Sequence, residues 1–183
     1  DVVYPAIPQV LRRFAADFPR VRVQLVSSFT RQLKADFARG EADVILTTEG
    51  PPDPGGETLA ERRLIWVGTP GGQAWRHRPL PLGYERNCIF RASVQERLDE
   101  AGIPWTVAVE SDQSKTIEAS TSADLVVMTL VEGTEPRQLE RIAHGGALPE
   151  LPTTRINLYA RTQGDRPVID ALVGLIRQGF ATA

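Results

Sequence analysis

Apolar residues recur with a helical period over residues 7–18. They occupy one face at the i, i+3, i+4, i+7 and i+11 positions: Ile7, Val10, Leu11, Phe14 and Phe18. Pro5 and Pro8 fit in or just before the first turn, where a missing N–H costs little. Pro19 ends the pattern, because the residue before a proline is pushed out of the α region. The sequence therefore predicts an amphipathic helix that stops before Pro19.

A strand and a second helix are predicted next. Val21, Val23 and Leu25 alternate with polar residues, which is typical of a β-strand. The following helix carries Leu33 and Phe37, with Thr30 as the expected N-cap and Gly40 as the expected C-cap. The apolar run within residues 42–47 then predicts a buried strand. Two helices and two strands with short connections indicate an α/β protein with a parallel sheet.

The later patterns predict one further lobe and a return to the first. Strands are expected at 64–67, 80–82, 105–109, 124–130 and 155–159, and helices at 94–101, 113–122 and 168–180. The last strand and helix are too short to form a domain alone. We therefore expect a discontinuous lobe I (residues 1–68 with 155–183) and an inserted lobe II (residues 69–154). Two chain crossings make a hinge, and a cleft between lobes is a common ligand site.

The hydroxyl-rich turn Ser27-Ser28-Phe29-Thr30 lies between a predicted strand and a predicted helix. In open α/β sheets, ligands bind at the carboxyl ends of strands. Ser28, Phe29 and Thr30 are therefore candidate binding residues. The alternative is that the hydroxyls serve only as turn and cap groups. The two roles are compatible, since a helix N-terminus also offers free N–H groups to an anion.

Other candidates for the same ligand are mainly in lobe II. Arg91 could pair with a ligand carboxylate, or it could be an ordinary surface arginine beside a packed Phe90. Thr129 interrupts an apolar strand near its carboxyl end, where the crevice lies, and a satisfied core threonine is the alternative. Tyr4, near the start of the chain, is a further candidate with weak support. The last candidates are the polar turn residues Ser111, Asp112 and Gln113, which could instead cap the following helix.

Composition and motifs exclude several classes of function. A net charge of -2 and a pI near 5.8 give no bulk basic footprint for nucleic acid. Cys88 is the single cysteine, so no intrachain disulfide can form. His77 and His144 lack metal-ligand spacing, and no nucleophile with a base, Walker loop or GxGxxG is present. No apolar run approaches the roughly 20 residues of a membrane span. We expect a cytoplasmic protein that is not an enzyme and has no metal, cofactor or membrane partner.

Three stretches resemble the effector-binding domain of LysR-type transcriptional regulators. They are VLRRFAADFPRVRVQLVSSFTRQLKADFARGEADVIL (residues 10–46), PLPLGYERNCIFRASVQERLDEAGIPW (79–105) and ALPELPTTRINLYA (147–160). The resemblance spans nearly the whole chain and implies two Rossmann-like lobes joined by two crossover segments, as in type 2 periplasmic binding proteins. Two departures stand out. The family's first strand is largely missing before Asp1, and its Ala-Gly-x-Gly run reads as residues 121–124, Thr-Ser-Ala-Asp.

The resemblance implies a sensor that binds a small metabolite, favoured as an anion, in the inter-lobe cleft. Thr30 falls on the hydroxyl position that often contacts effector in the family. A homodimer is expected, or a tetramer in the full-length protein, with residues 7–18 of one copy against 113–122 of its partner. DNA would be bound only through an N-terminal domain that this chain lacks. A solute-binding protein serving a transporter is the alternative, and an enzyme ranks last.

Overall fold

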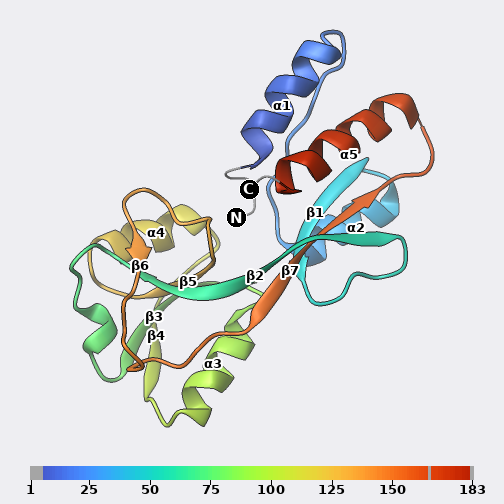
Figure 1. Ribbon diagram of the computed structural model, residues 1–183. Coiled ribbons are helices and arrows are strands. Elements are labelled where there is room, and N and C mark those ends of the chain that lie inside the picture. The colour runs from blue at the N-terminus through green and yellow to red at the C-terminus, as the bar shows by residue number, and fades with distance from the viewer. Residues whose placement is uncertain (1–5, 165, 182–183) are drawn as a thin grey trace. The chain divides into compact units, whose positions relative to one another are not determined.

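The computed structural model describes residues 6–164 and 166–181, and Figure 1 shows its helices and strands. The chain forms two compact units. Unit 1 runs to Arg62 and resumes at Thr154, and unit 2 is Arg63–Thr153. The chain leaves unit 1 inside strand β2 (Gly56–Gly68) and returns at strand β7 (Thr153–Ala160). The lobe boundaries placed at residues 68 and 154 remain predictions.

Unit 1 contains an antiparallel pair of strands. β1 (Val44–Glu49) pairs with β7 in a register that runs from Val44 opposite Ala160 to Glu49 opposite Arg155. The first part of β2 is the next strand in the order β1-β7-β2. Helix α2 (Thr30–Arg39) packs beside β1, and helices α1 (Ala6–Asp17) and α5 (Arg166–Ala181) pack on each other. Their apolar faces and β7 share one core, whose buried members are Ala6, Ile7, Val10, Ile156, Leu158, Ile169, Val173, Ile176 and Phe180.

The strand predicted at residues 21–25 is wrong in this structure. Residues 21–29 have no regular secondary structure, and Val21, Val23 and Leu25 are 39%, 41% and 60% exposed. Alternation makes a strand only where a neighbouring strand supplies hydrogen bonds and one face is buried. Among residues 6–164 and 166–181, no strand pairs with this segment. The parallel sheet expected at the start of the chain is therefore not formed by the described residues.

Unit 2 contains a parallel pair and an antiparallel pair of strands. β3 (Leu80–Glu85) and β4 (Trp105–Ser111) run parallel and are connected through helix α3 (Arg91–Glu100), as parallel strands require a crossover. β5 (Met128–Val131) and the short β6 (Glu140–Arg141) both pair antiparallel with the last part of β2. Helix α4 (Ser114–Ser122) packs on β3 and β4, and a 3-10 turn, η1 (Ala74–Arg76), contacts β3.

Two apolar clusters fill unit 2. The larger contains Leu80, Leu82 and Tyr84 of β3 with Val94 and Leu98 of α3, and the smaller contains Met128 and Leu130 with Ile117 and Val67. Side chains of residues 127–131 alternate between them, because Val127 and Val131 belong to the first cluster and Met128 and Leu130 to the second. None of the helices in the described part of the chain has the length and apolar character to cross a bilayer.

Asp124 has a left-handed backbone conformation. Its φ is 56°, which a short polar side chain tolerates better than most. Its carboxylate accepts hydrogen bonds from the backbone N–H groups of Gln73 (2.8 Å) and Ala74 (3.0 Å), where η1 begins. The strand predicted from Asp124 begins only at Met128, because Asp124 serves this turn.

Candidate functional site

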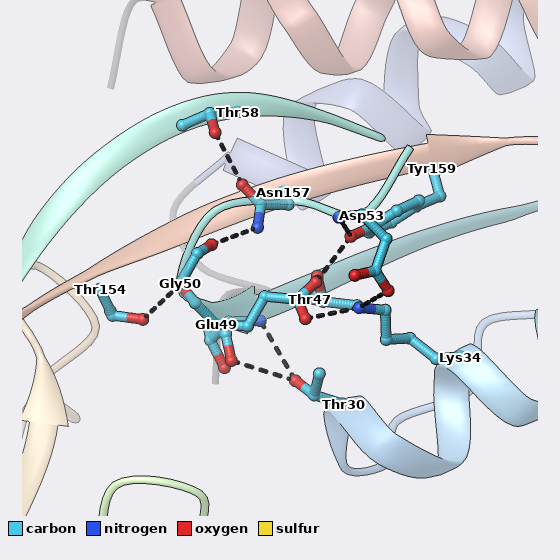
Figure 2. Close-up of polar contacts among 11 residues, drawn as sticks. Thr30, Lys34, Thr47, Glu49, Gly50, Asp53, Thr58, Thr154, Asn157 and Tyr159 are labelled. Atoms are coloured by element: carbon cyan, nitrogen blue, oxygen red, sulfur yellow. Dashed lines mark hydrogen bonds and ion pairs between the residues drawn. The ribbon is translucent and has the colours of Figure 1, made fainter. Parts of the chain in front are cut away.

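A polar network in unit 1 joins α2, the end of β1, the loop 50–55 and β7 (Figure 2). Lys34 of α2 is the one cation among the residues drawn in Figure 2. The Lys34 Nζ lies 2.6 Å from Glu49 Oε2 and 2.6 Å from Asp53 Oδ2. It also lies 5.2 Å from the centre of the Tyr159 ring. Two carboxylates and an aromatic face therefore fix the Lys34 ammonium over the loop.

Glu49 is the acceptor around which these groups converge. Glu49 Oε1 accepts hydrogen bonds from the hydroxyls of Thr47 (2.7 Å) and Tyr159 (2.8 Å), and Oε2 faces Lys34. Burial alone would raise the pKa of Glu49, but the hydrogen bonds from Lys34, Thr47 and Tyr159 outweigh it and hold the pKa below its usual value. Glu49 is therefore held ionised at neutral pH.

The same network fixes the loop 50–55. The Tyr159 hydroxyl accepts from the Asp53 N–H (3.0 Å), and Asn157 donates to the Gly50 carbonyl (2.9 Å) while accepting from Thr58 (2.9 Å). Asn157 is fully buried. The sequence pattern assigned 155–159 only to a strand and missed both residues. An amide inside an otherwise apolar strand was the available signal, since a buried amide needs partners.

Thr30 lies at the first position of α2, and its predicted capping role is wrong. The N-cap is Phe29, which makes no side-chain capping bond. The Thr30 hydroxyl instead donates to the Thr48 carbonyl and accepts from the Thr48 N–H, both at 3.2 Å. This pair of bonds joins the start of α2 to the end of β1, so the β1 backbone uses the group that would otherwise cap the helix. Ser27 and Ser28 are exposed, and Phe29 is half-buried. Tyr4 lies outside the described residues.

The unit 2 candidates Phe90 and Arg91 stand at the start of α3. Phe90 is the N-cap residue and packs partly on the larger cluster. The Arg91 guanidinium already has a carboxylate, Glu110 of β4, at 2.6 Å. Glu110 Oε1 also faces Arg86 at 3.4 Å. Arg91 was predicted to pair with a carboxylate of the ligand. In this structure it pairs with the carboxylate of Glu110 instead.

Ser111, Asp112 and Gln113 form the turn between β4 and α4. The Ser111 hydroxyl accepts from the Gln113 N–H at 3.1 Å, and Asp112 Oδ2 lies 3.5 Å from Arg86. The expectation that Ser111 or Asp112 caps the next helix is wrong, because the N-cap is Gln113 and has no side-chain capping bond. Local turn bonds occupy these groups before the helix begins.

Thr129 lies in β5, opposite Trp66 of β2. It is 7% exposed, and its hydroxyl makes no hydrogen bond of regular geometry among the described residues. The same is true of the Tyr84 hydroxyl, a residue that the sequence pattern did not single out. Thr129 is therefore a core threonine, and its hydroxyl lies close enough to the Tyr84 hydroxyl to oppose the rise that burial causes in the pKa of that phenol.

Metal and redox chemistry find little support in the part of the chain that the structure describes. No group of three or more His, Cys, Asp or Glu side chains there could hold a metal ion. Burial raises the pKa of the Cys88 thiol, which disfavours the reactive thiolate. His144 Nδ1 accepts from the N–H groups of Gly146 and Leu148, both at 3.3 Å, which is a turn role.

Comparison with known proteins shows the family to which the sequence of this chain is similar. Residues 2–181 match the LysR substrate binding domain. The chain is 23% identical over 181 residues to the HTH-type transcriptional regulator PecT of Dickeya dadantii (strain 3937), covering 98% of this chain and 57% of that regulator. It therefore spans little more than half the length of PecT.

Solved structures share the fold. HinK, a LysR family transcriptional regulator from Pseudomonas aeruginosa, superposes with a TM-score of 0.75 at 17% identity, over 100% of this chain and 68% of HinK. The BenM effector binding domain with its effector benzoate gives a TM-score of 0.68 at 16% identity, over 99% of this chain and 88% of that one. The family match extends over nearly every residue, so the chain belongs to the LysR substrate binding domain family.

Proposed function

We propose that this chain is the effector-sensing part of a LysR-type transcriptional regulator. The observation that carries the proposal is the family match over residues 2–181. PecT is an HTH-type transcriptional regulator, and BenM binds benzoate through a domain of this fold. These relatives favour a regulator over a transporter's solute-binding protein, and none of them is an enzyme by name. DNA binding and a homodimer or tetramer belong to the proposed full-length protein.

The proposed effector is a small metabolite, and each unit carries candidate contact residues for it. In unit 1 the contact surface is the turn Ser28-Phe29-Thr30, which the Thr30–Thr48 bonds hold at the end of β1. In unit 2 it is the start of α3, at Phe90 and Arg91, with Thr129 and the turn 111–113 as further candidates. An effector that binds one arrangement of the units better than another would shift the equilibrium between them.

A thermal-shift screen of small metabolites, with benzoate included, tests this function. An effector at one hundred times its Kd should stabilise the chain by about 2.7 kcal/mol, which corresponds to roughly 5–10 °C in Tm for a chain of this size. Thr30→Ala and Arg91→Ala should weaken the hit, whereas Arg31→Ala, a change at the next and exposed position of α2, should leave it unchanged. A broad screen without any stabilising metabolite would contradict the proposed function.

A further inference from the structure

One short segment between α1 and α2 carries most of the large apolar side chains that are exposed. All residues from 21 to 28 are exposed. Of the six exposed large apolar side chains in the described part of the chain, four lie here: Val21, Val23, Leu25 and Val26. In Figure 1 the segment runs as an open connection from the end of α1 to the start of α2. Exposed apolar residues gathered in this way indicate a binding surface.

The backbone of this segment is open as well. The last hydrogen bond before it joins the Val21 N–H to the Phe18 carbonyl, and the next joins the Leu33 N–H to the Phe29 carbonyl. Within the described part of the chain, no strand pairs with residues 22–28. Such a row of N–H and C=O groups is a template on which another strand can pair.

The order of its residues makes the segment complementary to itself. If two copies pair antiparallel about Val23, then Val23 lies opposite its own copy and Val21 lies opposite Leu25. These apolar pairs share one face, because alternate side chains of a strand point to the same side. On the other face Arg22 lies opposite Gln24, whose amide oxygen can accept a hydrogen bond from it.

Charge and pattern disfavour the competing arrangements. A parallel pair in register would place Arg20 and Arg22 opposite their own copies, and an antiparallel pair centred on Arg22 would also oppose two arginines. Like charges directly opposite each other destabilise a sheet. A register centred on Gln24 has fewer apolar pairs, because Val21 then lies opposite Ser27. A shift by one residue mixes apolar and polar side chains on each face.

We propose that residues 20–26 form an antiparallel two-stranded ladder with the same residues of a second copy of this chain. The two-fold axis passes through Val23. The contact does not depend on effector sensing, and it is separate from the expected pairing of α1 with α4. Two different two-fold contacts per chain can build a tetramer. A ladder of this length is a small interface, so we expect the association to be weak.

Disulfide trapping tests the contact on the whole chain. Cys88→Ala removes the native thiol, and Val23→Cys then introduces a thiol at the axis. Opposite residues of an antiparallel pair have Cα atoms about 4.5–5.5 Å apart, which suits a disulfide. Oxidation should therefore give a covalent dimer on a non-reducing gel, at a rate that rises with protein concentration.

Val21→Cys in the same background is the matched control. Because Val21 would lie opposite Leu25, the two copies of residue 21 would be about 14 Å apart along the ladder, too far for a disulfide. Equal rates for Val21→Cys and Val23→Cys would mean random collision and would overturn the ladder. A Val23→Cys chain that does not cross-link would also overturn it, and would leave the segment to a strand from another part of the full-length protein.

Changes at Gln24 test the charge pattern. In the Val23→Cys chain, Gln24→Glu places a carboxylate opposite Arg22 at two symmetric positions and should raise the cross-linking rate about fivefold. Gln24→Lys should lower it by a similar factor. Effects on the thiol itself would have the opposite sign, because a neighbouring cation favours the reactive thiolate. Rates that are equal, or that change in the opposite order, would overturn the pairing of Arg22 with Gln24.

Ala16→Arg separates this contact from the expected helix pairing. It should weaken the pairing of α1 with α4 and leave the cross-linking of Val23→Cys unchanged. Loss of the cross-link in the Ala16→Arg background would show that the segments meet only through the helices, and would overturn a separate contact. A failed metabolite screen, by contrast, would overturn the sensing function without bearing on this contact.

Discussion

At the scale of single residues, Glu49 decides how the end of β1 is organised. Its two carboxylate oxygens receive donors from three different elements: Lys34 of α2, Thr47 of β1 and Tyr159 of β7. A carboxylate that accepts several hydrogen bonds inside a protein is held in its charged form. The contacts that Glu49 makes should therefore stabilise the folded chain only while that carboxylate is ionised.

This coupling gives a pH dependence of known sign. The pKa of Glu49 in the folded chain is below its usual value of 4.5, so its contribution to stability is complete above that value and is lost as the pH falls through the folded-state pKa. Glu49→Gln should lower the free energy of unfolding at pH 7. The difference from wild type should shrink as the pH approaches 3, as urea unfolding at several pH values would measure.

Glu96→Gln is the control for this experiment, because Glu96 is exposed on α3. It should follow the wild-type curve at every pH. A Glu49→Gln deficit that stayed constant down to pH 3 would contradict the ionic role of Glu49 and indicate a packing defect instead.

At the scale of elements, hydrogen bonds to side chains of β7 hold the loop 50–55 more than bonds within the loop do. Tyr159 binds the Asp53 N–H and Glu49, and Asn157 binds the Gly50 carbonyl. These bonds hold the Tyr159 hydroxyl, and the ring leaves no room beside Gly56 at the start of β2. A Cβ added at Gly56 would lie 2.7 Å from Tyr159 Cζ, closer than atoms can approach.

Gly56→Ala should therefore destabilise the chain by about 1–3 kcal/mol, the usual effect of overpacking. Gly50→Ala, in the loop that leads to Gly56, is the matched control, since among the described residues nothing lies within 4 Å of a Cβ added there. Equilibrium urea unfolding of both variants makes the comparison. Equal stability of the two variants would show that Tyr159 can move away, contrary to the anchoring argument.

At the scale of the whole molecule, each unit has its own apolar core. The residues of α1, β7 and α5 form one cluster, and two further clusters lie in unit 2. The apolar stripe of α1 is used inside unit 1, where Ile7, Val10 and Phe14 are buried. If α1 also contacts a partner copy, it does so through its opposite face, which carries Arg12 and Ala16.

The expected dimer can be tested on that face. Sedimentation velocity of the chain should give a species of twice 20.1 kDa at high concentration. Ala16→Arg should move the equilibrium toward monomer, because a long charged side chain replaces a methyl group at the contact. Ala101→Arg, at an exposed position after α3, should not. A chain that remains monomeric at high concentration would count against the pairing of α1 with α4.

Most helices and several strands follow from the sequence because their signals are local. The 3.6-residue stripe of α1 and α5, the Gly40 C-cap of α2 and the apolar runs of β1 and β5 depend on neighbours along the chain. The same local signals carried the family resemblance, which the match to the LysR substrate binding domain confirmed. They also drew attention to Thr30, whose capping role was wrong, and to Thr129, while the effector-binding role of both residues stays a prediction.

Partners distant in sequence decided the rest. Residues 21–25 alternate like a strand, yet strand formation needs hydrogen bonds from a second chain segment, and the described residues provide none. Lys34, Asp53 and Tyr159 meet only after folding, across 125 residues of sequence from Lys34 to Tyr159 (159 minus 34). Likewise, no local pattern could show that Arg91 is paired with Glu110 or that the Thr129 hydroxyl lies beside Tyr84. Periodicity determines which residues are buried, whereas the identity of a polar group's partner is fixed only by tertiary contact.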